Sequence, residues 1–135
     1  MVMLDHVSIP VQDGPRAAAF YDAVLAGIGL RRVKEVNGSV GYGREAGWPM
    51  FWLEPGWLAP QSARTARPGL GLHISFRANS RAEVDAFHRA ALANGGRDAG
   101  APGPRPQYSS GFYGAFAFDP DGFKVEAVVR EDLRP

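Results

Sequence analysis

Apolar and polar residues alternate along residues 3–11, which is the pattern of a strand with one buried face. After a turn at 13–15, the apolar spacing changes to that of a helix over 16–26. Three further strands are predicted at 30–36, 39–45 and 49–54, with Asn37-Gly38 as the hairpin turn between the first two. The first part of the chain therefore predicts one strand, one helix and three strands.

The second part of the chain predicts the same order of elements. A strand at 70–77 is followed by the capping box Ser80-Arg81-Ala82-Glu83 and by a helix that ends near Gly95-Gly96. A short strand at 97–100, a Pro-rich loop at 101–111, and strands at 112–119 and 123–129 complete this part.

A shift of 67 positions aligns the two parts without gaps, placing His6-Val7-Ser8-Ile9 on His73-Ile74-Ser75-Phe76. We interpret the chain as two copies of one βαβββ unit. One copy has too few strands to enclose a core. We therefore predict an α+β fold in which the two repeats form a curved eight-stranded half-barrel with the helices outside. The single domain spans 1–135, with repeat one at about 3–54, a connector at 55–68 and repeat two at about 69–130.

Composition narrows the classes of function. The 135 residues include no cysteine, which excludes disulfides, thiolate nucleophiles and cysteine metal sites. A formal net charge of +1 without a basic cluster argues against a nucleic-acid partner. Asp5 and His6 come too early for a signal peptide, and no apolar run is long enough to span a membrane. We expect a cytoplasmic protein with a small-molecule substrate and no membrane partner.

Two histidines occupy equivalent positions in the repeats. His6 and His73 lie on the face of each first strand that is opposite the large apolar residues, and Glu126 faces away from an apolar row on the last strand. Two imidazoles and one carboxylate from three strands suit a divalent ion such as Fe, Mn, Ni or Zn. The alternative is that both histidines are ordinary hydrogen-bonded strand residues. His88, on the second helix, is expected to be structural.

The segments LDHVSIPV, LHISF and FAFDPDGFKVEAV resemble the vicinal oxygen chelate superfamily, which includes glyoxalase I, extradiol dioxygenases, fosfomycin-resistance transferases and bleomycin-resistance proteins. The resemblance covers residues 3–130 and implies metal ligands at His6, His73 and Glu126. The His, His and Glu set is more similar to that of the dioxygenases than to the glyoxalase set, which has two Glu. The chain length argues the other way, because those dioxygenases usually contain two such domains.

The resemblance leaves a fourth ligand position open. Aligning 51–54 with 123–126 makes Glu54 the counterpart of Glu126. If the strand has already ended before Pro55, Trp52 faces the cavity instead and three protein ligands remain. We favour the site with three ligands.

Aromatic and basic residues are candidates for the walls of the site. The expected aromatic wall consists of Trp48, Trp52, Tyr108, Phe112 and Tyr113. The arginines expected to hold an anionic group are Arg44, Arg64, Arg67 and Arg105. Among these we expect substrate binding by Trp52, Arg105 and Tyr108. Tyr113 is the expected proton donor or hydrogen-bond partner of the substrate, and the resemblance to glyoxalase implies that Glu126 also acts as a base.

These observations predict a glyoxalase- or dioxygenase-like metalloenzyme whose metal binds two vicinal oxygens of a small substrate. The alternative is a metal-free protein of the bleomycin-resistance type that binds an antibiotic or an aromatic ligand. A third option is a scaffold whose site has decayed. The resemblance also implies a homodimer, with the site either within one chain or formed by His6 of one subunit and His73 and Glu126 of the other. The sequence does not choose between these two arrangements.

Overall fold

The βαβββ order occurs twice in the computed structural model of the chain, which describes residues 3–45, 47–55 and 72–133. The elements of the first unit are β1 (Val7–Val11), α1 (Gly14–Ala26), β2 (Arg31–Val36), β3 (Ser39–Gly43) and β4 (Phe51–Pro55). Those of the second unit are β5 (His73–Arg77), α2 (Arg81–Ala93), β6 (Arg97–Pro104), β7 (Phe112–Phe118) and β8 (Lys124–Arg130), followed by the short 3-10 helix η2 (Glu131–Leu133). Most of the predicted connector, 56–68, lies outside the described residues.

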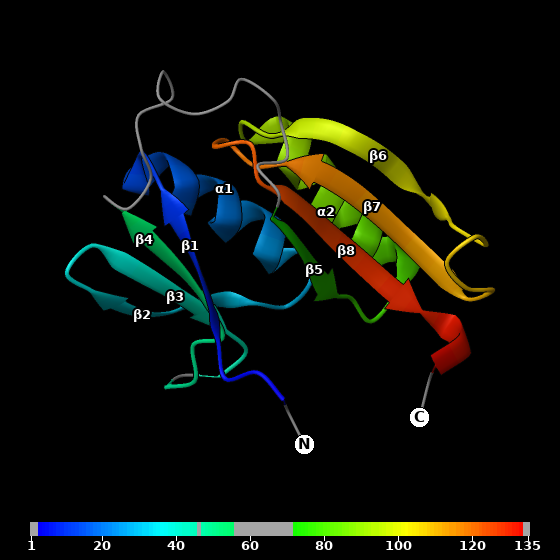
Figure 1. Cartoon of the computed structure of the whole chain (residues 1–135), viewed down its shortest axis with the longest axis horizontal. Helices are drawn as coiled ribbons and strands as arrows, with labels where there is room; N and C mark the ends of the chain where they lie inside the picture. Colours follow the sequence, from blue (N-terminus) through cyan, green and yellow to red (C-terminus); the bar gives the residue numbers. More distant parts are fainter. Residues whose placement is uncertain (1–2, 46, 56–71, 134–135) are drawn as a thin grey trace.

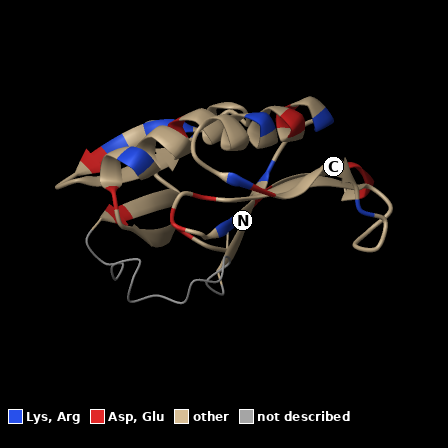
Figure 2. Cartoon of the chain, turned by 90° about the horizontal axis from the view of Figure 1, so that it is seen from above, with Lys and Arg blue, Asp and Glu red and all other residues tan. Residues whose placement is uncertain are grey.

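Each unit contributes one four-stranded mixed sheet. The strand orders are β1-β4-β3-β2 and β5-β8-β7-β6. In both sheets the first strand pairs in parallel with the last, and the remaining pairs are antiparallel. The helices lie together on one side of the two sheets (Figures 1 and 2). This is the predicted α+β half-barrel architecture with the helices outside, although the two sheets are not joined into a closed one.

The two units share one hydrophobic core beneath the helices. Ile9, Val11 and Leu53 are almost completely buried, as the alternating pattern predicts for one face of a strand. Aromatic side chains cross from one unit to the other. The ring of Phe51 on β4 lies 5.2 Å from that of Phe76 on β5 between centroids, in an edge-to-face arrangement. The relative position of the units is therefore set by core packing.

Both helices begin at side chains that accept hydrogen bonds from the first turn. Asp13 accepts from the backbone N–H of Arg16 at 3.0 Å, and Ser80 accepts from that of Glu83 at 3.2 Å. The Glu83 carboxylate accepts from the N–H of Asn79 at 2.6 Å, one residue before the cap. The predicted capping box thus forms with its second hydrogen bond moved by one position.

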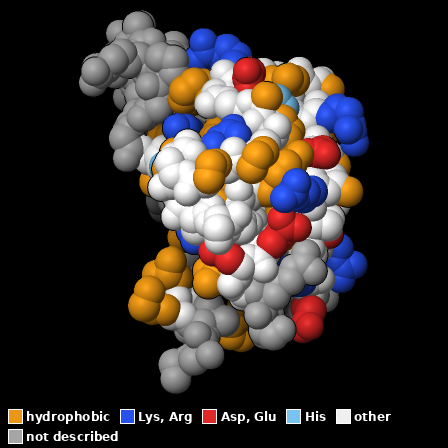
Figure 3. Space-filling model, turned by 90° about the vertical axis from the view of Figure 1, so that its right-hand side faces the viewer, with side chains coloured by type: hydrophobic (Ala, Val, Ile, Leu, Met, Phe, Trp, Pro, Cys, Tyr) orange, Lys and Arg blue, Asp and Glu red, His pale blue; other side chains and the backbone are white. Residues whose placement is uncertain are grey.

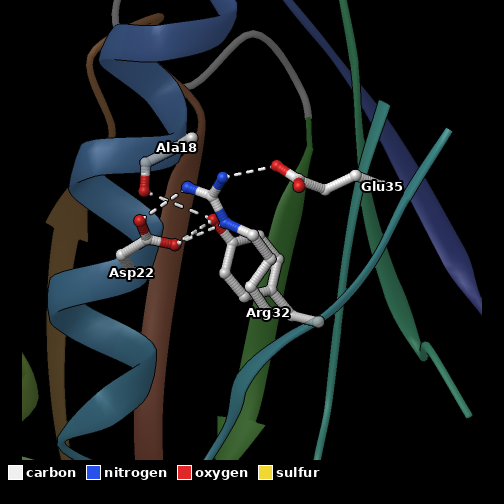
Figure 4. A network of polar contacts seen from close by, with 5 residues as sticks. Ala18, Asp22, Arg32 and Glu35 are labelled. Carbon is white, nitrogen blue, oxygen red and sulfur yellow. Dashed lines mark hydrogen bonds and ion pairs between the residues drawn. The ribbon is translucent and has the colours of Figure 1, made fainter. Parts of the chain in front are cut away.

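A polar network joins α1 to strands β2 and β3 (Figure 4). The guanidinium of Arg32 on β2 donates to Asp22 on α1 at 2.6 Å and to Glu35 at 2.6 Å. The hydroxyl of Tyr42 on β3 donates to the same Asp22 carboxylate at 2.8 Å. Burial, followed by this hydrogen bond, raises the pKa of Tyr42.

A second buried network joins the units. The turn between β7 and β8 places Asp119 against α1, where Tyr21 donates to it at 2.6 Å. The backbone N–H groups of Asp121 and Phe123 each donate to Asp119 at 2.9 Å. Burial nevertheless raises the pKa of Asp119 to about 6, because desolvation outweighs these hydrogen bonds.

Strand β6 is longer than predicted. Residues 101–104, expected to belong to a Pro-rich loop, continue this strand to Pro104 and pair with β7 through irregular registers. Strand β6 is at the edge of its sheet, where proline is tolerated because one side of the strand needs no ladder hydrogen bonds. Proline content alone was therefore a poor guide to where the strand ends.

Charged groups of both signs are mixed on one face of the molecule (Figure 3). On the face drawn in Figure 3, Lys and Arg side chains are interspersed with acidic and apolar ones. No helix in the described ranges is long and apolar enough to cross a membrane.

Candidate functional site

An open cavity of about 580 Å³ lies on the second sheet, on the face opposite the core. Its lining residues come from β5, β7, β8 and the loop before β7. They are His73, Gln107, Tyr108, Phe112, Phe116, Lys124, Glu126 and Arg130.

Strand alternation brings the polar residues of β8 to this cavity. Val125 and Ala127 are completely buried in the core, so Glu126 between them points to the other face. Parallel pairing of β5 with β8 places His73 beside Lys124 and next to this position. The Nε2 atom of His73 lies 3.0 Å from Oε1 of Glu126. The structure therefore brings together two of the three predicted metal ligands.

Glu126 is unusual for a carboxylate because only 4 % of it is exposed. Its Oε2 atom is buried and has no hydrogen-bond partner in the described part of the chain. A buried acceptor without a donor costs about 1–3 kcal/mol, and more when it is charged. Gly114 on β7 allows Glu126 to pack closely against this strand, since a Cβ at that position would lie 3.2 Å from Oε2 and 2.8 Å from the ring of Phe112. A buried carboxylate oxygen without a donor, on a carboxylate that lies next to an imidazole, fits a divalent cation.

His6 lies apart from these two residues. Its side chain is 49 % exposed, and Nδ1 lies 2.7 Å from Oδ1 of Asp5. It lines a different cavity, of about 670 Å³, which β1 and β5 border. Across the three described ranges, no group of three His, Asp or Glu side chains is close enough to hold a metal ion. One chain by itself does not unite the three predicted ligands.

Strand register identifies the counterpart of Glu126 in the first unit. Ser75 pairs with Glu126, and its repeat equivalent Ser8 pairs with Trp52. Glu54 remains in the sheet, paired with Pro10, and accepts a hydrogen bond from the hydroxyl of Ser39. The register thus places an indole, which is not a metal ligand, at the fourth position.

Tyr113 does not line the cavity. It packs against the hydrophobic core, and its hydroxyl donates to Asp85 of α2 at 2.8 Å. The guanidinium of Arg81 lies 4.7 Å from the centre of its ring. The hydrogen bond to Asp85, followed by burial, raises the pKa of Tyr113. The structure therefore places the expected proton donor on the helix side of the sheet.

Two of the predicted wall residues do line the cavity. Tyr108 and Phe112 pack edge to face with their ring centroids 5.0 Å apart. Arg105 uses its guanidinium to donate to the carbonyl of Ala101 at 2.6 Å, and lies 5.7 Å from the ring centroid of Phe116. Arg105 thus supports a wall residue but does not itself line the cavity.

The other candidates lie elsewhere. Trp48 is 56 % exposed, and Arg44 lines the second cavity together with His6. Arg64 and Arg67 lie outside the described residues. His88 is buried, with Nε2 2.9 Å from Oδ1 of Asp98.

Four lining residues were missed from the sequence: Gln107, Phe116, Lys124 and Arg130. Lys124 Nζ lies 4.8 Å from the ring centroid of Phe116, and the Arg130 guanidinium lies 5.1 Å from that of Phe112. Lys124 and Arg130 are separated from Glu126 by two and four positions, which places all three on one face of a strand. This two-residue period was the signal that could have identified them.

Comparisons with known proteins agree with this architecture. Residues 3–127 match the model of the Glyoxalase/Bleomycin resistance protein/Dioxygenase superfamily. A glyoxalase/bleomycin resistance protein from Albidiferax ferrireducens T118 is 32% identical, with a TM-score of 0.78 over 96% of this chain and 100% of that one. Two structures are similar in fold at lower identity. A lactoylglutathione lyase from Agrobacterium tumefaciens is 22% identical (TM-score 0.63, covering 98% of this chain and 96% of that one). A glyoxalase I mutant from Zea mays is 20% identical (TM-score 0.69, covering 94% and 46%). No curated protein matches the chain.

Proposed function

Because the chain belongs to the glyoxalase/bleomycin resistance protein/dioxygenase superfamily, we propose that it is a divalent-metal-dependent enzyme acting on a small molecule with two vicinal oxygens. The observation that carries this proposal is the pair formed by His73 and Glu126. The pair lies on the floor of an open cavity, and the carboxylate keeps one buried oxygen without a partner among the described residues.

The donor set fits the metal that is proposed. An imidazole nitrogen and a carboxylate oxygen are ligands for Zn, Fe, Mn or Ni, and Glu126 offers a second oxygen, Oε2, that has no partner among the described residues. The third donor in the proposal is His6 from a second copy of the chain. Its imidazole is half-exposed and lies away from the His73 site of its own chain, so it is accessible to a partner.

When bound, the ion supplies Lewis-acid stabilisation of negative charge on a substrate oxygen. The chain's own residues have three tasks in the proposal. His73 and Glu126 orient the reacting end of the substrate. Phe116, paired across the strands with Glu126, gives this end an apolar wall. The carboxylate of Glu126 accepts a proton from the substrate.

Metal titration of chelator-treated protein tests the proposal. Calorimetry with Zn²⁺ and Mn²⁺ should show one ion per chain, and His73→Ala or Glu126→Gln should weaken binding at least tenfold. Glu54→Gln is the matched control, because this carboxylate already has the Ser39 hydroxyl as a partner and should leave metal binding unchanged. Absence of stoichiometric binding by the wild type, or equal binding by Glu126→Gln, would reject the metal site.

A metal-free binding protein is the second candidate. Its support is that only two of the three expected ligands meet in one chain, while Tyr108, Phe112 and Phe116 give the cavity an aromatic lining. This candidate predicts that an aromatic ligand binds equally well before and after treatment with a chelator. The enzyme proposal predicts that the chelator weakens binding of a ligand with two vicinal oxygens.

A further inference from the structure

The face of β8 that lines the cavity carries charges in a fixed order. Lys124, Glu126, Val128 and Arg130 all lie on this face, because side chains alternate along a strand. At about 3.3 Å per residue, the Cα atom of Arg130 lies about 13 Å along the strand from that of Glu126. The Glu126 carboxylate, where the metal is proposed, is thus separated along the strand from the Arg130 guanidinium at the end of the lining.

The stretch between these two charges is small and apolar. Val128 of β8 pairs with Gly114 of β7, and neither presents a charge. Phe112 and Tyr108 stand at the Arg130 end and form an edge-to-face pair. A flat apolar body of one or two rings fits between the two ends of such a surface.

Arg130 is held in place but is not neutralised. Its guanidinium lies 5.1 Å from the ring centroid of Phe112. By contrast, Arg32 and Arg81 both form ion pairs with carboxylates, at nitrogen–oxygen distances of 2.6–2.7 Å. For Arg130 no such ion pair exists within the described ranges. Of the residues lining the cavity, Lys124 and Arg130 are basic and Glu126 is acidic, so the site favours an anion.

We infer that the substrate is an elongated molecule with its vicinal oxygens at one end and a carboxylate at the other, and that Arg130 binds this carboxylate. The inference rests on the proposed function for the end at Glu126. The guanidinium can hold a carboxylate through two parallel hydrogen bonds while its face remains on Phe112. Arg130 is therefore assigned as a determinant of substrate specificity.

Two probes that differ only in the remote group test this assignment. Benzohydroxamate has a pair of chelating oxygens on a ring, and 4-carboxybenzohydroxamate adds a carboxylate at the opposite end. Affinities are measured by calorimetry, with Zn²⁺ and with a chelator, for the wild type, Arg130→Gln and Arg130→Lys. Arg97→Gln is the matched control, since Arg97 also lies over a phenylalanine (5.6 Å from the Phe118 ring) but does not line the cavity.

The wild type should bind the carboxylated probe at least tenfold more tightly than benzohydroxamate. Arg130→Gln should abolish this preference, Arg130→Lys should keep part of it, and Arg97→Gln should keep all of it. Equal affinity of the wild type for both probes, or a preference that survives in Arg130→Gln, would overturn the assignment.

The two proposals fail in distinguishable ways. If Zn²⁺ strengthens binding of both probes but the carboxylate gives no advantage, the metal site stands and the role of Arg130 is wrong. If the carboxylate gives an advantage that depends on Arg130 while Zn²⁺ has no effect, the anion site stands and the metalloenzyme proposal is wrong.

Discussion

Replacing Asp119 with Asn should remove a large pH dependence from the stability of the fold. Only 4 % of Asp119 is exposed, and it accepts hydrogen bonds from Tyr21 of the other unit and from two backbone N–H groups of its own turn. The charged form is nevertheless disfavoured, because burial raises the pKa of Asp119 from 3.8 to about 6. The negative charge of Asp121 nearby acts in the same direction.

The sign and size of the effect follow from linkage. Since the folded protein holds the proton of Asp119 more tightly than the unfolded chain, the stabilisation is complete below pH 3.8 and is lost as the pH rises through about 6. The change in pKa from 3.8 to about 6 corresponds to about 3 kcal/mol, at about 1.4 kcal/mol per pKa unit. Asn is neutral at every pH and has no such dependence.

Urea unfolding of the wild type and of Asp119→Asn at intervals between pH 4 and pH 8 measures this directly. The difference between the two unfolding free energies removes the contribution of carboxylates far from this turn, and it reports on Asp119 together with its coupling to Asp121. Relative to the variant, the wild type should lose about 2–3 kcal/mol over this range, mostly below pH 7. A constant difference, or a wild type that gains stability relative to the variant as the pH rises, would refute the reasoning.

Two further substitutions test the site. Gly114→Ala places a Cβ 3.2 Å from Oε2 of Glu126 and 2.8 Å from the ring of Phe112, so it should weaken Zn²⁺ binding and cost about 1–3 kcal/mol of stability. Calorimetry and urea unfolding measure these changes, and unchanged metal affinity would contradict the expected need for Glu126 to pack closely against β7. Tyr113→Phe should lower the free energy of unfolding by about 0.5–1.5 kcal/mol, because the hydrogen bond to Asp85 is lost, and should leave metal affinity unchanged. A loss of metal affinity in this variant would contradict the assignment of Tyr113 to the helix side of the sheet.

The fold could be predicted from the sequence because the repeat and the alternation are local signals. The alternation of His6, Ser8 and their neighbours identified the buried face of β1, and the match at His73 showed that the pattern recurs. The predicted end of β6 was wrong because an edge strand tolerates proline, and the sequence does not show which strand is at the edge.

The site could be predicted only in part. His73 and Glu126 meet because neighbouring strands of one sheet carry them, and that pairing follows from the βαβββ order. Tyr113 was assigned to the wrong face because aromatic residues occupy both faces of β7, so polarity did not distinguish it from Phe112. The distance of His6 from the other ligands depends on how two units pack, which no alternation pattern encodes.

The central claim is that His73 and Glu126 of one chain and His6 of another hold one metal ion, and mixing two variants tests it most directly. His6→Ala and His73→Ala should each lack high-affinity Zn²⁺ binding on their own. After subunit exchange in an equal mixture, half of the dimers contain one of each variant, and each of these has one intact site. About one quarter of the wild-type Zn²⁺ sites should therefore return. Full binding by either variant alone, or no recovery after exchange, would contradict the account.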